Sequence, residues 1–442
     1  MRSTLLLSLA FGLAASSPLE KRQKIAFQSV AAAAESVIAT LPAAALGPTN
    51  VGVVATTQAP ATSAYNLPSA ISKATSSITV ANSPNTSLAP TSLPANAKSA
   101  AKRELEQRDS AAASSTSCAT YTGKGPVVTS SPSAWINDPA LTSAATNAPV
   151  PTGYVQADGF QNLKGSLQMM GYLTVKSLDT YDTQACANYC DNEPLCMGFD
   201  IYYERDPAAN TTCSPGKNPD SITFIGCTLY GFHVNASLAT NTGQWRDNFQ
   251  VVITASNGYN KVGVKHSGIY DNIPGFSKPV ELGNASIDAL FWPPAVFDSV
   301  DAAGNNKLYT YMGMRSLQQP YDARVCASIC SAQTAANKNS PDKQTGTYMP
   351  CNFFTAYVLA KNDVPVGLQC AFYMLPWNTT YATNTGYYDY PNWPKQDVSN
   401  HYTIYNSMAF TASSFAQGTA DFGNNNTLAG SYWTNPNAFH SS

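Results

Sequence analysis

Short runs of aromatic and β-branched residues recur in the second half of the chain, separated by glycine, proline and asparagine. Apolar runs bounded by turn-forming residues predict β-strands. Two such regions follow one another, and each predicts a small antiparallel sheet. The runs lie at 199–203 and 353–359, around Cys227 and Cys370, and in the closing segments FQVVITA (249–255) and HYTIYNSMAF (401–410).

One segment of each region predicts a short helix instead. Each begins after an aspartate, Asp182 or Asp322, whose carboxylate can accept hydrogen bonds from the free N–H groups of a first helical turn. The residues that follow, TQACANYC and ARVCASIC, are compatible with a helix. Their cysteines are four residues apart and therefore fall on one helical face. Each helix can thus be fastened to strands through that face.

The two regions are copies of one another. The pentapeptide ATNTG begins at Ala239 and again at Ala382, at the same distance from the preceding cysteine in each copy. Matching cysteines, an identical pentapeptide and equal spacing indicate a tandem duplication. Four cysteines allow three pairings in each copy, and the residues alone do not choose among them. The cysteines are Cys186, Cys190, Cys196 and Cys227 in the first copy, and Cys326, Cys330, Cys351 and Cys370 in the second.

This pattern resembles the PAN/apple domain, in which a helix carrying CAxxC is followed by one strand cysteine among aromatics and a later one. Together with FDIYYERDP at 199 and ATNTGQWR at 239, it is similar to a family of secreted fungal proteins described as apple-like, carbohydrate-binding-like or fruit-body-specific. The resemblance covers about residues 150–412. It implies one helix cradled by a curved antiparallel sheet, and a module that binds proteins or glycans. The pairing that it implies is Cys186–Cys227, Cys190–Cys196, Cys326–Cys370 and Cys330–Cys351.

The N-terminus and the cysteine count predict secretion. Residues 1–17 combine a basic start, the apolar core TLLLSLAFGLA and small residues, as a signal peptide does. Ten cysteines in such a chain imply disulfides, and the two outside the repeats, Cys118 and Cys213, are expected to pair. The net charge is −2 and 12% of residues are charged, which does not favour nucleic acid or acidic lipid as a partner. No later run is long enough for a membrane helix.

The rest of the chain divides by composition. Residues 18–115 are rich in alanine, serine, threonine and proline, which predicts a disordered pro-segment or stalk. Two dibasic pairs, Lys21-Arg22 and Lys102-Arg103, are candidate processing sites within it. The expected boundaries beyond it are an extended lead-in at 116–164, the first repeat at 165–257, a linker at 258–305, the second repeat at 306–412 and a loose tail at 413–442.

Six N-x-S/T sequons are spread over predicted loops, which fits a glycosylated surface. They begin at Asn85, Asn210, Asn235, Asn284, Asn378 and Asn425.

Few residues form a pattern used in catalysis. The histidines make no metal-binding pair, and the sequence contains neither a nucleophile elbow nor a phosphate-binding loop, so no metal or cofactor is predicted. Asp200 and Glu204 are spaced to share one face of a strand, and two carboxylates can cleave a glycosidic bond if they face it together. We favour a structural ion pair with Arg205 or Arg246, or a solvated turn.

The second repeat carries an insertion, YYDYPNWPKQDVSNH, in which aromatic residues stand among prolines. A stiff aromatic platform suits stacking against the C–H faces of sugars, with polar neighbours supplying hydrogen bonds. The ATNTG segment is favoured as a tight turn followed by core packing, with Gly243 or Gly386 at positive φ. The candidate binding residues are Tyr387, Tyr388, Asp389, Tyr390, Asn392 and Trp393.

The sequence therefore predicts an α+β protein with two disulfide-stapled modules of one helix on a curved antiparallel sheet. The expected function is secreted, non-catalytic binding of a cell-wall or host glycan or of another extracellular protein. The alternatives are a polysaccharide hydrolase that uses Asp200 and Glu204, and a passive structural glycoprotein of the cell wall. The oligomeric state and the number of repeats that bind stay open.

Overall fold

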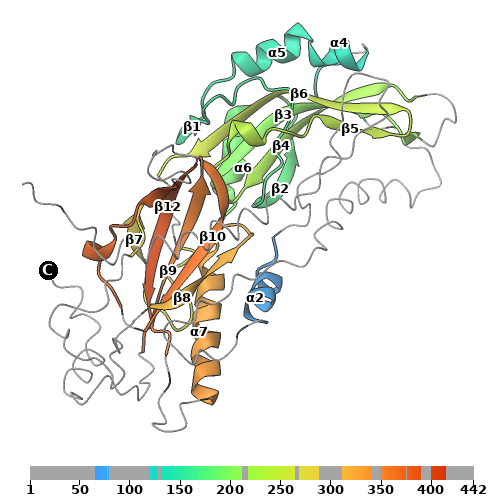
Figure 1. Cartoon of the computed structure of the whole chain (residues 1–442). Coiled ribbons are helices and arrows are strands. Elements are labelled where there is room, and N and C mark those ends of the chain that lie inside the picture. The colour runs from blue at the N-terminus through green and yellow to red at the C-terminus, as the bar shows by residue number, and fades with distance from the viewer. Residues whose placement is uncertain are drawn as a thin grey trace, which may run out of the picture.

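The described chain contains two six-stranded antiparallel sheets, one for each copy (Figure 1). The computed structural model describes residues 65–76, 78, 120, 122–127, 131–211, 218–263, 268–287, 311–340, 348, 350–374, 376–389 and 400–414. The first sheet contains β1 (Tyr154–Gln156), β2 (Tyr172–Ser177), β3 (Gly198–Pro207), β4 (Ser221–Tyr230), β5 (Gly243–Arg246) and β6 (Phe249–Lys261). The second contains β7 (Val280–Gly283), β8 (Tyr311–Leu317), β9 (Phe353–Lys361), β10 (Val364–Tyr373), β11 (Gly386–Asp389) and β12 (Asn400–Thr411).

The sheets repeat one topology. The first has the order β1-β6-β3-β4-β2, with β5 also beside β6, and the second has β11-β12-β9-β10-β8, with β7 also beside β12. Both closing strands break register at a residue with positive φ, Ala255 in β6 (55°) and Asn406 in β12 (53°). A bulge of this kind bends a strand locally and is not a general feature of sheets. The two sheets therefore share both their strand order and the place of this bulge, as a tandem duplication predicts.

One helix packs on each sheet and is held there by two disulfides. The helices are α6 (Thr183–Asn192) and α7 (Ala323–Asn339), and they begin after the predicted caps. Asp182 accepts a hydrogen bond from the Ala185 amide (3.0 Å), and Asp322 accepts one from the Arg324 amide (3.1 Å). The four pairings within the repeats are confirmed, namely Cys186–Cys227, Cys190–Cys196, Cys326–Cys370 and Cys330–Cys351.

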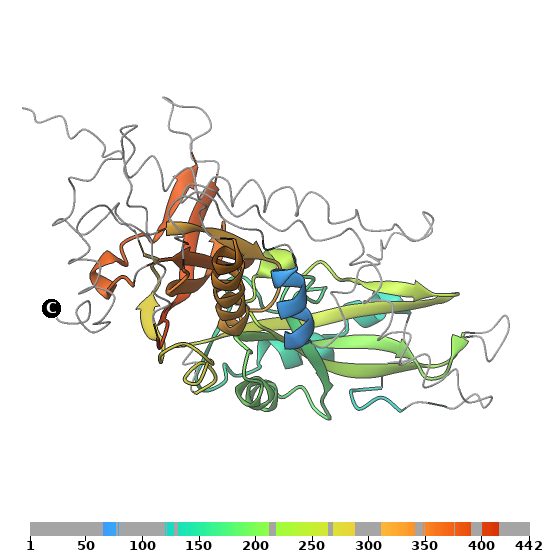
Figure 2. The same cartoon turned by 90° about the horizontal axis from the view of Figure 1, so that it is seen from below.

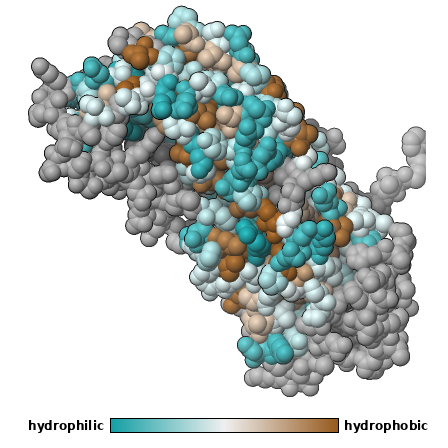
Figure 3. Space-filling model, turned by 180° about the vertical axis from the view of Figure 1, so that it is seen from behind, coloured by the Kyte–Doolittle hydropathy of each residue, from teal (hydrophilic) through white to brown (hydrophobic). Residues whose placement is uncertain are grey.

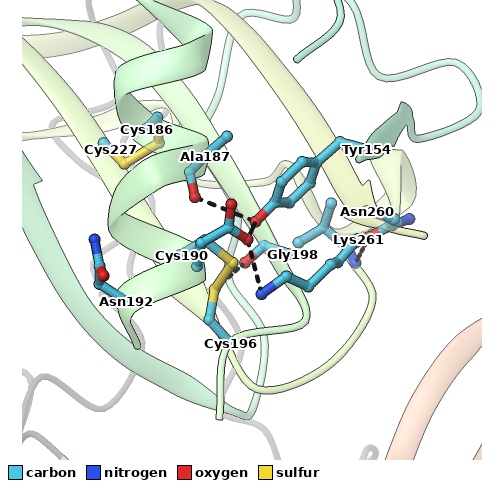
Figure 4. The surroundings of a disulfide bond; sticks show 12 residues. Tyr154, Cys186, Ala187, Cys190, Asn192, Cys196, Gly198, Cys227, Asn260 and Lys261 are labelled. Carbon is cyan, nitrogen blue, oxygen red and sulfur yellow. Dashed lines mark hydrogen bonds and ion pairs between the residues drawn. A yellow bond between two sulfur atoms is a disulfide. The ribbon is translucent and has the colours of Figure 1, made fainter. Parts of the chain in front are cut away.

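Polar contacts hold α6 at a second place, next to its disulfides (Figure 4). The Tyr154 hydroxyl, from β1, donates to the Asp191 carboxylate (2.9 Å) and lies 3.2 Å from the Ala187 carbonyl oxygen. Lys261, at the end of β6, forms an ion pair with the same carboxylate at 2.9 Å. The end of α6 is therefore tied to the β1–β6 edge as well as to β3 and β4.

The segment that was expected to be an extended lead-in contains two helices, α4 (Pro132–Ile136) and α5 (Pro139–Thr146). Each starts with a capping side chain followed by proline, Ser131 before α4 and Asp138 before α5, which is a strong helix start signal. Trp135 and Leu141 are fully buried in the core cluster that contains the first pair of disulfides. Docking of these side chains makes the short helices part of the first repeat.

A helix also lies within residues 18–115, for which the composition predicted disorder. Helix α2 (Leu67–Thr75) packs beside α7, as Figure 2 shows. Its small side chains Ala70 and Ala74 are buried, and just before it the Tyr65 hydroxyl donates to the buried carboxylate of Asp322 (3.1 Å). Small residues allow close helix approach and one tyrosine anchors the end, so a segment poor in apolar side chains is ordered by docking.

The repeats share one hydrophobic core cluster. Phe160, Met197 and Phe232 of the first repeat lie in the same cluster as Tyr321 and Phe354 of the second. The segment expected to be a linker, 258–305, takes part in it and also supplies β7 to the second sheet. The residues of this segment that are buried in the shared cluster are Tyr270, Ile273 and Phe276. Among the described residues, no helix is long and apolar enough to cross a membrane.

The two disulfides of the first repeat should differ in their contribution to stability. Cys186–Cys227 spans 41 residues and Cys190–Cys196 spans 6. The entropy of loop closure gives about 4 kcal/mol for the longer and about 2 kcal/mol for the shorter. Replacing both cysteines of the longer bridge by alanine should therefore lower the free energy of unfolding about twice as much as replacing both cysteines of the shorter bridge. Urea denaturation measures the two losses. Equal losses would show that packing at the sulfurs outweighs loop entropy.

Tyr65→Phe tests what orders α2. The change keeps the ring and removes only the hydroxyl, and hydrogen bonds to charged groups contribute about 1.5–3 kcal/mol. Amide hydrogen exchange over α2 should accelerate while exchange in α7 stays the same. Tyr189→Phe, at an exposed tyrosine of α6, is the matched control. Unchanged exchange in α2 would mean that apolar packing alone holds the helix.

Candidate functional site

The carboxylate pair considered for hydrolysis is not presented to solvent. Asp200 lies in β3 and is fully buried, while Glu204 is half-buried on the same face of that strand. The Ser256 hydroxyl donates to Asp200 at 2.6 Å and the Leu167 amide donates at 2.9 Å. Burial raises the pKa of Asp200 to about 7 in spite of these two bonds. In the described structure, Asp200 links β3 to β6 and to the segment entering the sheet.

The second repeat has no carboxylate at this place. Thr355 and Ser407 occupy the positions of Asp200 and Ser256, and both are buried. Neither hydroxyl has a hydrogen-bond partner among the described residues. Arg246, one of the two arginines expected to form an ion pair with this acidic cluster, lies 3.5 Å from the carboxylate of Asp206. The buried acid of the first repeat is therefore not required by the shared fold.

The ATNTG segments form tight turns. Gly243 and Gly386 have φ values of 111° and 120°, and a side chain on Gly386 would collide with the Tyr402 carbonyl oxygen. The side-chain oxygen of Asn241 accepts from the Gly243 amide (3.2 Å), and that of Asn384 accepts from Gly386 (3.1 Å). The asparagine backbones also form β-bridges to Ser166 and Ser286. Each pentapeptide thus holds the segment that enters its own sheet.

Two sequons occupy equivalent places immediately before these turns. Asn235 caps the 3-10 helix η3 (Ala236–Leu238) and Asn378 caps η5 (Thr379–Tyr381). Their side-chain oxygens accept from the Ser237 amide (2.9 Å) and the Thr380 amide (3.0 Å). Asn210 is partly exposed and Asn284 is exposed, while Asn85 and Asn425 lie outside the described residues. Glycosylation of these asparagines stays a prediction.

Of the six candidate binding residues, Tyr388 is the one whose side chain is described. It lies in β11 with 58% of its surface exposed, and its ring centre is 6.3 Å from that of His401 in β12. Tyr387 and Asp389 flank it in the same strand, with only their backbone described. Tyr390, Asn392 and Trp393 lie outside the described residues. Core packing, which the sequence favoured for the aromatic residue after ATNTG, is therefore wrong for Tyr388.

The first repeat has an aromatic residue at the equivalent position. Trp245 in β5 pairs with Gln250 in β6, as Tyr388 pairs with His401. Trp245 is half-buried. Both sheets therefore place an aromatic ring beside a polar side chain, where the strand after the ATNTG turn meets the closing strand. The signal for this in the sequence is the common position of the two residues, two after the glycine of ATNTG.

A buried histidine lies at the junction of the repeats. His233, just after β4, stacks on Tyr405 of β12 with ring centres 4.7 Å apart. Burial lowers the pKa of His233 to about 4. Nearby, the side-chain amide nitrogen of Asn235 donates to the Asp363 carbonyl oxygen (3.4 Å). The junction therefore contains polar groups in addition to the shared core. Burial disfavours the protonated, charged form of His233.

The pairing of Cys118 with Cys213 falls outside the described residues. Described residues close to each cysteine do meet, because Thr120 forms an antiparallel bridge with Ala209. The pairing stays a prediction.

Comparisons with protein-family models, with curated proteins and with solved structures find no match to this chain. Within the described ranges, no group of three or more potential metal ligands is found. Hydrophilic and hydrophobic residues are interspersed over the face of the molecule in Figure 3. Function must therefore be inferred from the chain's own side chains.

Asp200 and His233 make stability depend on pH in opposite directions. The pKa of Asp200 rises from 3.8 to about 7 on folding, so stability falls as pH rises through this window, by on the order of 4 kcal/mol. The pKa of His233 falls from 6.5 to about 4, so its contribution makes stability rise with pH between those values. The two effects partly offset each other in the parent protein.

Asp200→Asn removes the first effect and leaves the second. The stability of the variant relative to the parent should therefore increase as pH is raised from about 4 to about 7, measured by urea denaturation. Asp179→Asn, at a side chain that is 81% exposed, is the matched control for removal of a carboxylate at the surface. A difference for Asp200→Asn that is constant over this pH range would contradict the shifted pKa.

Proposed function

We propose that this chain is a secreted, non-catalytic binding protein that recognises a cell-wall or host glycan through tandem PAN/apple-like modules. The support for the modules is the helix fastened to an antiparallel sheet by two disulfides, with the pairing that the resemblance implies, in both repeats. Four disulfides and the predicted signal peptide are compatible with an extracellular protein.

The observation that carries the glycan assignment is the exposure of Tyr388. A large aromatic side chain that is 58% exposed in a strand offers a flat apolar ring to a ligand. Sugars present C–H faces that stack on such rings, and His401 lies beside it as a hydrogen-bonding group. The sequence places further aromatic residues immediately after β11, at Tyr390 and Trp393.

The test is retention of the full chain on insoluble chitin, β-glucan, mannan and cellulose, with release of soluble sugar followed in the same tubes. We expect saturable retention without release on at least one of these polysaccharides. Tyr388→Ala should weaken retention about tenfold, which corresponds to the loss of one aromatic anchor. The triple change of Tyr388, Tyr390 and Trp393 to alanine should abolish it.

Tyr189→Ala is the matched control, because Tyr189 is 42% exposed but lies on α6 of the first repeat, whereas β11 belongs to the second sheet. Its retention should equal that of the parent. Release of sugar would instead support the hydrolase alternative. Failure of retention on every polysaccharide would overturn the glycan assignment and favour a protein ligand or a structural role.

A further inference from the structure

Four hydrogen-bond donors form a row across the first sheet. Arg205 in β3 is directly opposite Thr223 in β4 and opposite Val252 in β6. Trp245 in β5 is opposite Gln250, which is two residues from Val252 and therefore shares its face. Paired strand residues point to the same side of a sheet, so all four side chains start from one face. We call Thr223, Arg205, Gln250 and Trp245 the donor row.

Each member of the donor row has a buried polar atom without a hydrogen-bond partner among the described residues. The atoms are Thr223 Oγ1, Arg205 Nε, Gln250 Nε2 and Trp245 Nε1. Thr223 and Gln250 are only 2% and 6% exposed. Buried polar groups are normally paired, and an unpaired group calls for a specific reason such as a ligand. Four of them at neighbouring positions make a shared ligand a better reason than four separate defects.

The donor row is positively charged. Within the described part of the chain, no ion pair between Arg205 and a carboxylate is found. Its neighbour Asp206 lies 3.5 Å from Arg246 instead. The guanidinium is nevertheless held in place. One of its NH groups donates to the Gln250 carbonyl oxygen (2.8 Å), and its Cζ lies 4.3 Å from the centre of the Phe249 ring. A fixed cation surrounded by N–H and O–H donors favours a ligand that supplies oxygen acceptors and negative charge.

Neighbouring segments flank the row on its own face. Helix α4 lies on β6, where the Thr254 hydroxyl donates to the Ile136 carbonyl oxygen (2.9 Å). On the other side, the Gly125 amide donates to the Thr223 carbonyl oxygen (3.1 Å), and a side chain at Gly125 would meet the Thr223 methyl group. The row is therefore set between two segments of the same repeat, with the half-buried ring of Trp245 at its β5 end.

The second repeat has no charged residue at the position of Arg205. Ala360 stands opposite Thr403 as Arg205 stands opposite Val252, and it therefore takes the place of the arginine. The aromatic–polar pair persists as Tyr388 and His401. The fold does not demand a cation at this position, so Arg205 is a property of the first repeat alone.

We propose that the donor row binds a carboxylate-bearing glycan, with Arg205 and Gln250 donating to a uronate carboxylate and Trp245 contacting the sugar ring. An aromatic ring beside an oxyanion site on a sheet face suits a sugar acid better than a peptide, which pairs through backbone at a sheet edge. The proposal rests on the proposed glycan-binding function, but it concerns the other repeat and a different set of residues.

The test uses oligogalacturonate and its fully methyl-esterified form, which keeps the sugar chain and removes the negative charge. Titration calorimetry on the full chain should show clear binding of the acid and little binding of the ester. Arg205→Gln should weaken binding of the acid about tenfold or more, since a charge-assisted hydrogen bond is lost. Lys278→Gln removes a positive charge that is 73% exposed from the segment just before β7, outside the donor row, and should leave binding unchanged.

Two further variants keep the proposal falsifiable if Arg205→Gln does not fold. Trp245→Phe retains a ring and removes the indole N–H, and Gln250→Leu removes a donor at similar volume, so each should weaken binding several-fold. Equal binding of acid and ester, no binding of either, or unchanged binding in these variants would overturn the proposal. Tyr388→Ala should not affect the acid, so failure here is distinguishable from failure of the β11 site.

Discussion

The attachment of one helix to one sheet through two cysteines a turn apart is the constraint on which each repeat depends. In both copies the first helix cysteine is bonded to a long inner strand, Cys186 to β4 and Cys326 to β10. The second is bonded to a cysteine two residues before the neighbouring strand begins. Loops of about 40 residues closed in this way contribute about 4 kcal/mol each, which is a large part of the 5–15 kcal/mol typical of whole domains. Other segments pack beside the covalently fixed helix, as α4 and α5 do in the core cluster that contains the Cys186–Cys227 bridge.

Those other contacts explain what the sequence could and could not predict. The strands and the starts of α6 and α7 follow from local signals, namely β-branched runs and aspartate caps. Helices α2 and α5 consist largely of alanine, serine, threonine and proline, so their order comes from docking of a few side chains such as Ala70 and Leu141 against distant partners. A window of sequence contains no information about those partners. The disulfide pairing came from resemblance, because four cysteines per copy leave three choices.

In the candidate site, too, local sequence predicted some features, while others depend on partners that are distant in the chain. The spacing of Asp200 and Glu204 correctly places both on one face of β3, yet the burial of Asp200 depends on Leu167, which arrives from another segment. The sequence supports two conflicting predictions for Tyr388, core packing after the ATNTG turn and exposure in an aromatic platform, and local sequence could not choose between them. The donor row could not be recognised at all, because its members are far apart in the chain and only the register of four strands brings them together.

The two copies differ where the backbone does not require identity. Both keep the positive-φ glycine of ATNTG, its asparagine bridge and the bulge of the closing strand, since each of these has a geometric role. They differ in side chains that leave the backbone unchanged: Asp200 against Thr355, and Arg205 against Ala360. A duplicated module under purely structural demands has no reason to place an arginine without an acidic partner among the described residues in one copy and an exposed tyrosine in the corresponding region of the other. That asymmetry favours two surfaces of different chemistry on a common scaffold, one for charge and one for an apolar sugar face.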